Sequence, residues 1–252
     1  MCLILLAYGV RADWPLVVAA NRDEFYARPT RRAEFWPDAA ALVAGRDLTH
    51  GGTWLGVTRA GRFAAVTNFR EAARQNEDAP SRGRLTVDFL LGDEGPRAYL
   101  ERLARRAAEF NGFNLLAGDA EGLWYFSNRG GGPRELGPGV YGLSNHLLDT
   151  PWPKVERGKR ALAESLARAG PPDVEELFRV LAESEPAPDA SLPDTGVGLE
   201  RERLLSPLFI RSETYGTRSS TVVLFEEGGR VRFVERAFGA GGGGEARFEF
   251  QT

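Results

Sequence analysis

Cysteine, methionine, histidine and lysine are scarce in this chain of 252 residues. It has one cysteine, one methionine and two histidines (His50 and His146), and only two of its 32 basic residues are lysines (Lys154 and Lys159), which leaves thirty arginines. A single cysteine excludes an internal disulfide and fits a reducing cytoplasm. One cysteine and two distant histidines give no spacing typical of a metal site. We therefore expect a cytoplasmic protein without a bound metal.

Long apolar runs and a large excess of one charge are also missing. No run reaches the roughly 18 apolar residues that would predict a membrane span. The start, MCLILLAYGV, is apolar but lacks the basic residues that open a signal peptide, so it is interpreted as a buried strand. The net charge is −3, which predicts no nucleic-acid partner. The use of arginine in place of lysine indicates a GC-rich or thermophilic host.

The pattern along the chain predicts one domain over residues 1–252. Short apolar runs bounded by turn residues predict strands at 2–8, 15–20, 53–58, 62–68, 113–117, 123–127, 140–144, 219–225, 230–238 and 246–250. Helical patterns cover 81–91, with Ser81 as a candidate cap, and 96–110, 154–169 and 173–182. Residues 185–198 are predicted to form a long loop. Residues 239–244, GAGGGG, lack the lysine and following helix of a phosphate-binding loop, so a flexible turn is expected.

Strands as uniformly apolar as 2–8 must be covered on both faces. Two antiparallel sheets packed face to face, with helices outside, would satisfy this requirement and would also use the pairs of helices. The predicted fold class is therefore α+β, a four-layer αββα sandwich.

Cys2 is the first residue that could carry chemistry. A small second residue favours removal of Met1, which would leave a thiol nucleophile and a free α-amine on the same residue. The amine has an ordinary pKa near 8 and can take the thiol proton, so no histidine is needed. The alternative is a small buried hydrophobic residue, which is the commonest role of a lone cysteine.

The segment Asn21-Arg22-Asp23-Glu24 directly ends the second predicted strand. Strand alternation places Asn21 and Asp23 on one face and Arg22 and Glu24 on the other. An amide and a carboxylate beside the N-terminus could hold the α-ammonium group or its proton. The alternative is an ordinary polar turn.

Two further asparagines and one arginine stand where apolar strands end or begin. Asn68 ends RFAAVTN and Asn145 follows VYGLS, so each could donate a hydrogen bond to a developing oxyanion. Arg218 lies among the hydroxyls of TRSST and could bind a carboxylate or a phosphate. Both asparagines would also suit a turn, and Arg218 would suit a polar strand start.

Taken together, the motifs are more specific than their parts. MCLILLAY, ANRDEFYARP, GGTWLGVTRAGRFAAVTNFRE, PSRG, YGLSNHLLDTPWPKV and GTRSSTVVLF resemble the NRDE family, which includes the Transport-and-Golgi-organisation proteins of eukaryotes. These motifs extend from Cys2 to about Phe225, so the resemblance covers nearly the whole chain.

The NRDE family is in turn similar to the cysteine N-terminal-nucleophile hydrolases, such as cholylglycine hydrolase and penicillin V acylase. That resemblance implies a nucleophilic Cys2, an Asn-x-Asp unit at Asn21 and Asp23, and oxyanion-binding amides at Asn68 and Asn145. One departure stands out. Those hydrolases carry an arginine immediately before the Asn-x-Asp unit, and Ala20 occupies that position here. Arg218 is the candidate for their later arginine.

Three functions remain open at this stage. The first is an amidohydrolase or thioesterase that acts on a small acyl substrate, with Arg22, Arg218, Trp54 and Phe69 as substrate-binding residues. The second is a carrier that has no cofactor of its own and binds haem or an acyl lipid in the cleft that holds the substrate in the related hydrolases. The wall of that cleft would be lined by Phe25, Tyr26, Trp54 and Phe69. Plain core packing is the alternative for these aromatic residues. The third is an interaction module. Exposed sheet edges would also allow a homodimer.

Overall fold

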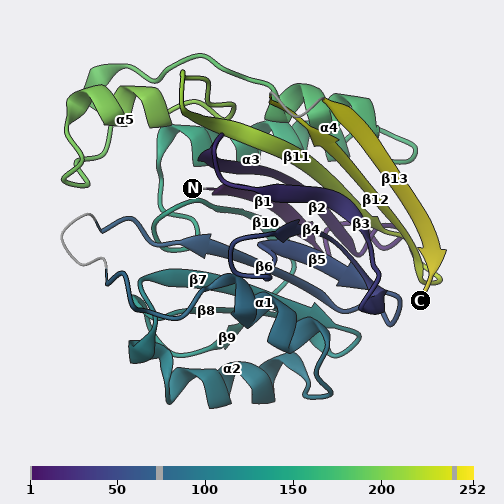
Figure 1. Cartoon of the computed structure of the whole chain (residues 1–252). Coiled ribbons are helices and arrows are strands. Elements are labelled where there is room, and N and C mark those ends of the chain that lie inside the picture. Colours follow the sequence, from purple (N-terminus) through teal and green to yellow (C-terminus); the bar gives the residue numbers. More distant parts are fainter. Residues whose placement is uncertain (1, 72–75, 240–242) are drawn as a thin grey trace.

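The structure, a computed structural model, describes residues 2–71, 76–239 and 243–252 (Figure 1). Met1 and the middle of the predicted turn at 239–244 lie outside these residues. The described part of the chain forms two antiparallel sheets with helices on their outer faces, which confirms the predicted α+β class and the αββα layering.

The first sheet contains β1, which begins at Cys2, as the second of its six strands. Its order is β10-β1-β2-β11-β12-β13, and all neighbours are antiparallel. The strands are β1 (Cys2–Tyr8), β2 (Leu16–Phe25), β10 (Gly139–Leu143), β11 (Tyr215–Phe225), β12 (Arg230–Ala237) and β13 (Gly244–Gln251). The β1–β2 hairpin is confirmed, and its register places Cys2 opposite Arg22.

The second sheet follows the chain order without a crossover, β3-β4-β5-β6-β7-β8-β9. Its strands are β3 (Thr30–Trp36), β4 (Ala39–Asp47), β5 (Leu55–Thr58), β6 (Phe63–Asn68), β7 (Phe113–Asp119), β8 (Gly122–Ser127) and β9 (Arg134–Glu135). Three of them, β3, β4 and β9, were not predicted from the sequence.

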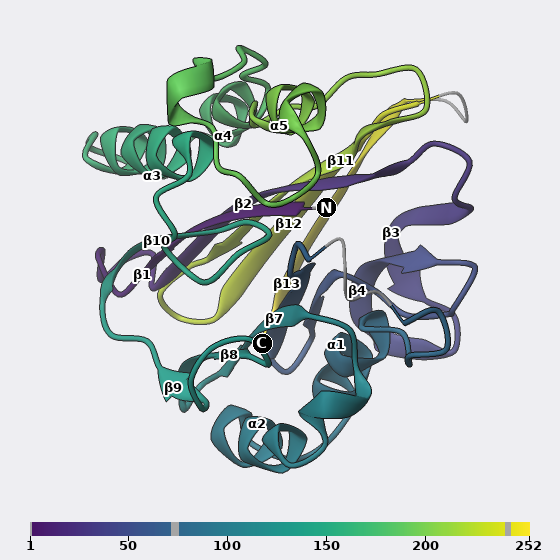
Figure 2. The ribbon, with the colours of Figure 1, turned by 90° about the vertical axis from the view of Figure 1, so that its left-hand side faces the viewer.

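Each sheet has its own helix layer (Figures 1 and 2). Helices α1 (Gly83–Leu90) and α2 (Pro96–Ala104) cover the second sheet, and α3 (Pro153–Leu166) and α4 (Val174–Leu181) cover the first. A short helix α5 (Leu199–Leu205) follows the predicted loop. No helix in the described ranges is long and apolar enough to cross a membrane.

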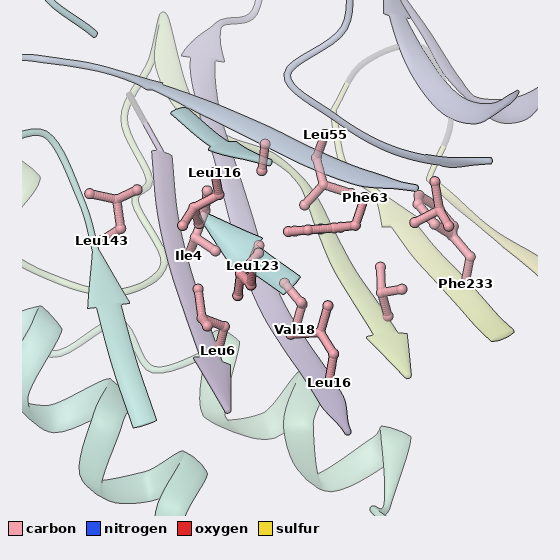
Figure 3. Packing of buried hydrophobic residues seen from close by; sticks show 14 of the residues in the cluster. Ile4, Leu6, Leu16, Val18, Leu55, Phe63, Leu116, Leu123, Leu143 and Phe233 are labelled. Carbon is pink, nitrogen blue, oxygen red and sulfur yellow. The ribbon is translucent and has the colours of Figure 1, made fainter. Parts of the chain in front are cut away.

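Strand alternation divides the apolar residues of the first sheet between two cores. Ile4 and Leu6 point to the second sheet and meet Leu116 and Leu123 there (Figure 3). Their odd-numbered neighbours, such as Leu3, pack against helices α3 and α4. Both faces are dry, as the unbroken apolar run of β1 predicted. The sheet therefore has an inner face toward the second sheet and an outer face toward the helices.

Some helix boundaries differ from the prediction. Ser81 does not cap α1, because Arg82 is the N-cap residue and no side-chain capping bond is present. The helix predicted at 96–110 stops at Ala104, and a single 3-10 turn, Ala107–Glu109, follows. The predicted loop at 185–198 is irregular apart from a 3-10 turn at Asp189–Ser191.

Candidate functional site

A cleft of about 800 Å³ opens between the two sheets, at the end where β1 begins and β6 ends. Cys2 lies on its wall. Seven arginines border it among the described residues, namely Arg22, Arg28, Arg31, Arg32, Arg46, Arg82 and Arg218. Five acidic residues also border it, namely Asp23, Glu24, Asp47, Glu77 and Glu235. The cleft is therefore polar and carries more arginines than carboxylates.

The Cys2 thiol sits at the inner face of the first sheet, because even-numbered residues of β1 face that way. The residue is 8% exposed. Burial raises the pKa of the thiol, and the Asp23 carboxylate adds to this, while the Arg22 guanidinium and a hydrogen bond from the Asp23 backbone lower it. In the chain as described, burial outweighs activation, so the thiol form is favoured at neutral pH.

The Asn21–Glu24 segment divides its side chains between two faces of β2, as alternation predicted. Arg22 and Glu24 border the cleft on the inner face, next to Cys2. Arg22 is 8% exposed, its nearest carboxylate oxygen belongs to Glu24 at 3.8 Å, and its Nη1 atom has no hydrogen-bond partner among the described residues. A buried guanidinium nitrogen without a partner, facing a cleft, is suited to bind an incoming carbonyl or anion.

Asn21 faces the helices instead and is fully buried. Its Nδ2 atom donates to the carbonyls of Leu181 at 2.9 Å and Leu208 at 2.8 Å, and its Oδ1 atom accepts from the Ser220 hydroxyl at 2.6 Å. These bonds use both amide hydrogens, so Asn21 ties β2 to the end of α4 and to β11. It does not border the cleft.

Asp23 lies on the same outer face as Asn21 and is 1% exposed, although it also borders the cleft. Its Oδ1 atom accepts a hydrogen bond from the Thr217 hydroxyl at 2.7 Å. Burial raises the pKa of this carboxyl, and the Lys154 cation is the foremost of the described groups that lower it. Asp23 and Cys2 thus lie on neighbouring strands but on different faces, with a backbone contact between them.

A β-bulge brings Thr217 to Asp23. Thr217 pairs with Asp23, but Ser219 pairs with Arg22, which leaves Arg218 as the extra residue. The extra residue changes the alternation, so Thr217 points to the helix side and Ser219 to the cleft. Arg218 borders the cleft, and its Nη1 atom donates to the backbone carbonyls of Phe25 at 2.9 Å and Arg28 at 3.1 Å.

The two predicted oxyanion residues lie together but differ in access. Asn68 is half-buried and borders the cleft at the end of β6. Asn145 is fully buried, does not border the cleft, and donates from Nδ2 to the Asn68 carbonyl at 2.8 Å. Its own carbonyl accepts from the Arg70 backbone at 2.7 Å. Asn145 therefore holds the strand end that presents Asn68.

Two glycines of the motifs meet at the opposite wall. A Cβ on Gly52 would lie 2.6 Å from the backbone of Gly83, so only glycine permits this approach. The contact sets the start of α1 beside the cleft and places Arg82 there. Arg82 donates to the Gly112 carbonyl at 3.0 Å. Burial lowers the pKa of Arg82, and the negative charge of a Cys2 thiolate would oppose this, so the two groups interact.

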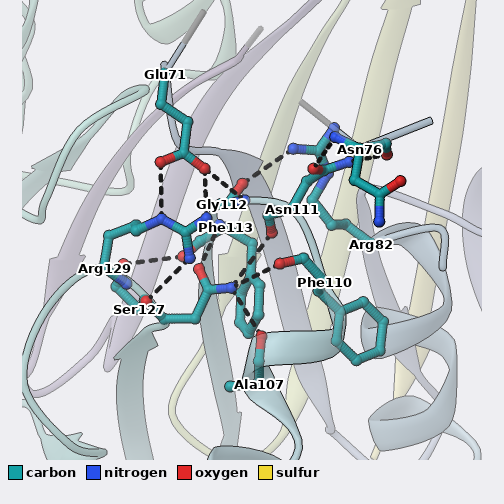
Figure 4. A network of polar contacts seen from close by, with 11 residues as sticks. Glu71, Asn76, Arg82, Ala107, Phe110, Asn111, Gly112, Phe113, Ser127 and Arg129 are labelled. Atoms are coloured by element: carbon teal, nitrogen blue, oxygen red, sulfur yellow. Dashed lines mark hydrogen bonds and ion pairs between the residues drawn. The ribbon is translucent and has the colours of Figure 1, made fainter. Parts of the chain in front are cut away.

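A polar network fixes this wall from behind (Figure 4). Glu71 forms an ion pair with Arg129 and accepts from the Gly112 backbone at 3.1 Å. The Asn76 backbone donates to Asn111 Oδ1 at 2.8 Å. Glu71 and Asn76 are thus both tied to residues 111–112.

The predicted aromatic lining is only partly present. Trp54 borders the cleft, but Phe25, Tyr26 and Phe69 do not. Phe69 packs on the His146 ring instead, with 4.8 Å between the ring centroids. In the described ranges, no group of three or more histidine, cysteine or acidic side chains is placed to hold a metal ion.

Arg82, Lys154 and Glu235 were missed in the sequence analysis. Glu235 borders the cleft from β12, accepts from the Ala33 backbone at 2.6 Å, and has its pKa raised by burial. Lys154 is buried behind Asp23. For Lys154 a signal existed, because it is one of two lysines in an arginine-rich chain. Arg82 lies in the PSRG motif, which could have drawn attention to it. Glu235 carried no signal, since only the packing of the two sheets brings it to the cleft.

Comparisons with known proteins agree over most of the chain. Residues 1–240 match the family described as Transport and Golgi organisation 2. The Transport and Golgi organization protein 2 homologs of Bos taurus and Homo sapiens are 38% and 37% identical to this chain, and each alignment covers 94% of this chain and 93% of the homolog. The Transport and Golgi organization protein 2 of Drosophila melanogaster is 28% identical over 93% of this chain and 91% of its own.

Two solved structures are more distant. The mutant C2A conjugated bile acid hydrolase from Clostridium perfringens is 8% identical, with a TM-score of 0.47 over 100% of this chain and 97% of its own. The N-acylethanolamine-hydrolyzing acid amidase ortholog of Caenorhabditis elegans is 13% identical, with a TM-score of 0.44 over 88% of this chain and 92% of its own.

Proposed function

This chain belongs to the Transport and Golgi organisation 2 family, and we propose that it is a cysteine hydrolase of the N-terminal-nucleophile kind, acting on an amide or thioester bond of a small acyl substrate. The observation that carries the proposal is the position of Cys2. The sole thiol of the chain begins a central strand and borders a cleft of about 800 Å³. A purely structural cysteine could pack anywhere in the core, whereas Cys2 borders the cleft together with Arg22 and Asn68.

The reaction would begin with removal of Met1, which frees the α-amine of Cys2. The amine takes the thiol proton, and the sulfur bonds to the substrate carbonyl carbon. The resulting oxyanion is stabilised by Asn68 from the cleft wall. Collapse of this intermediate breaks the bond to the amine or thiol leaving group, which takes the proton. Water then attacks the acyl-cysteine, releases a carboxylic acid and restores the thiol.

The remaining side chains have supporting roles in this proposal. Asp23 orients the α-amine from the outer face of β2. Asn21 holds β2 on the helices, and Asn145 acts through Asn68, because its amide already donates to the Asn68 carbonyl. Direct donation from Asn145 to the oxyanion stays a prediction from the sequence. Arg22 takes the place beside Cys2 that an arginine at position 20 would otherwise supply, since Arg22 and Cys2 are register partners.

Substrate binding is assigned to the part of the cleft around Arg22, Arg218 and Trp54. Phe69, which was predicted to join them, does not border the cleft and packs on the His146 ring instead. The lining favours a polar or anionic group on the substrate over a fully apolar one, because arginines outnumber aromatic residues on the wall.

The test uses the chain expressed without an N-terminal tag. Intact mass first shows whether Met1 is removed. The processed protein is then mixed with acyl thioesters of N-acetylcysteamine and with acyl p-nitroanilides. We expect a mass increase of one acyl group on Cys2, followed by slow release of the acid. Cys2→Ala must show neither the adduct nor release, and equal release by Cys2→Ala and wild type would contradict the proposal.

A carrier of haem or of an acyl lipid is the second candidate. It is favoured by one observation, the burial that raises the pKa of the Cys2 thiol and leaves it a poor nucleophile in the chain as described. Haem would place its carboxylates on the cleft arginines. Titration with haem at micromolar protein tests this reading. A Soret shift that disappears in Arg22→Met would support the carrier, and an unchanged spectrum would remove haem from consideration.

A further inference from the structure

A cluster of buried charges lies on the outer face of the first sheet, on the side of β2 away from the cleft. Asp23 comes from β2, Lys154 from the first turn of α3, Glu202 from α5, and Arg70 from the segment after β6. Asp23, Lys154 and Glu202 are 1%, 2% and 4% exposed. The Arg70 side chain is 7% exposed and its Nη1 atom is 2.8 Å from Glu202 Oε2. Four segments distant in sequence thus bring two acids and two bases together.

Lys154 stands out within this cluster. Its ammonium nitrogen is buried and has no hydrogen-bond partner among the described residues. The cavity beside it, bordered also by Arg70 and Glu202, measures about 10 Å³. A space of that size holds about one water molecule, so bulk solvent does not screen the charge.

The composition makes the choice of lysine informative. The chain has thirty arginines and two lysines, and both lysines lie on α3. Lys159 forms an ion pair of 2.8 Å with Asp149 and its side chain is 24% exposed, so it resembles the surface pairs that arginine makes elsewhere in the chain. Lys154 makes no such pair with any residue that the structure describes. A compact ammonium that acts through space, without directed hydrogen bonds, is the form of cation that lysine supplies and arginine does not.

We propose that Lys154 is a positioning residue whose cation keeps the buried Asp23 carboxyl ionised, so that Asp23 can hold the α-amine that Cys2 would expose. The first half of this statement concerns Asp23 alone. Only the second half rests on the proposed function.

The electrostatics of the cluster agree with this role in both directions. Burial raises the pKa of Asp23 and Lys154 lowers it, while burial lowers the pKa of Lys154 to about 8 and Asp23 opposes that change. At pH 7 Lys154 is therefore still mostly protonated. The other charged or titratable groups that face the pair are Cys2, Arg22, Arg70, Glu202 and Tyr215.

The experiment follows the Asp23 carboxyl itself. Protein labelled with ¹³C at aspartate is titrated by NMR, and the Asp23 resonance is identified by its loss in Asp23→Asn. In the wild type we expect an ionised carboxylate at pH 7. In Lys154→Met the titration midpoint of Asp23 should move up by about one unit or more, which is a decrease of about tenfold or more in its ionisation constant. Lys159→Met, on the same helix, is the matched control and should leave the midpoint unchanged.

A second measurement covers the case in which Lys154→Met does not fold. Two charges that interact must shift each other equally, so Asp23→Asn should lower the Lys154 midpoint below that of the wild type. The proposal is overturned by an Asp23 midpoint that stays unchanged in folded Lys154→Met. It is equally overturned by a Lys154 midpoint that stays unchanged in Asp23→Asn.

The role for Cys2 is read separately, from the pH profile of its alkylation in the processed chain. A profile displaced in Lys154→Met, but unchanged in Lys159→Met, supports the complete proposal. An Asp23 midpoint that shifts while the alkylation profile stays in place would leave the charge pair standing and would remove its link to the hydrolase.

Discussion

Asn21 and Arg22, which lie on opposite faces of β2, differ in how completely their polar atoms are bonded. On the outer face, Asn21 uses both amide hydrogens and its oxygen within the protein. On the inner face, Arg22 keeps a buried Nη1 atom without a partner among the described residues, one residue along the same strand. Bonded polar groups hold a structure in place, and unbonded ones at a cleft are available to a ligand. Asn21 thus supports the strand from which Arg22 reaches the cleft.

The largest expected effect tests the supporting face. Asn21→Ala should lower the free energy of unfolding by about 3 kcal/mol, because two buried carbonyls and the Ser220 hydroxyl would lose their partner. Urea unfolding followed by circular dichroism measures it. Arg22→Met, which keeps a long apolar stem, is the matched change on the inner face and should cost less than about 1 kcal/mol. Equal losses in the two variants would erase the contrast between the faces.

The second prediction concerns the reactivity of Cys2 against pH in the chain that retains Met1. Burial raises the pKa of the thiol, so the folded protein should be alkylated more slowly at pH 7 than the urea-unfolded protein. Each unit of upward shift reduces the thiolate fraction about tenfold. The difference should narrow as the pH rises through the folded pKa, where the buried thiol finally ionises. Iodoacetamide labelling read by intact mass gives both rates, and faster labelling of the folded chain would show that activation outweighs burial.

The third prediction returns to Arg22, now as a source of charge. Its guanidinium lowers the pKa of the thiol, so Arg22→Met should slow alkylation at neutral pH by about fivefold, which corresponds to about 1 kcal/mol. Arg31→Met, at an exposed arginine of the cleft rim that pairs with Glu34, should leave the rate unchanged. If both variants slow the reaction alike, the effect belongs to the overall charge of the cleft and not to Arg22.

The smallest expected effect sharpens the comparison at Asp23. Thr217→Val keeps the shape of the side chain but removes the hydroxyl that donates to the carboxylate. We expect a loss of stability of about 1 kcal/mol at pH 7. The hydrogen bond to Asp23 stabilised the ionised form, so the Asp23 pKa should rise and this part of the cost should fade as the pH drops and the carboxyl protonates. The part due to the Ile210 backbone N–H, which donates to the same hydroxyl at 2.9 Å, should remain. Chemical denaturation at several pH values would reveal a constant loss if the hydroxyl served packing alone.

Patterns within single strands were predictable from the sequence. The β1–β2 hairpin, the layered arrangement and the two faces of Asn21–Glu24 follow from apolar runs and period-two alternation. Strand β3, TRRAEFW, was missed because it lies at a sheet edge and mixes charged with apolar residues. Helix α5, LERERLL, buries only Glu202 and Leu205 and shows no clean apolar stripe.

The site was harder to predict wherever it depends on contacts between distant segments. Cys2, Arg22 and Asn68 could be selected from their places at strand ends, and all three border the cleft. Asn145 looked equivalent to Asn68 in sequence, yet its amide is used to hold Asn68. Only the packing of the two sheets decides which of two similar strand ends reaches the cleft.

The single extra residue at Arg218 has a consequence for the whole of β11. The side chains of a strand alternate between its two faces, and the bulge shifts this alternation by one residue. Before the bulge, odd-numbered residues such as Thr217 face the helices. After it, odd-numbered residues such as Ser219 face the cleft. One strand can thereby contribute to both the support and the opening. Deleting Arg218 would restore regular alternation along β11. The side chains on one side of the deletion would then all turn to the opposite face.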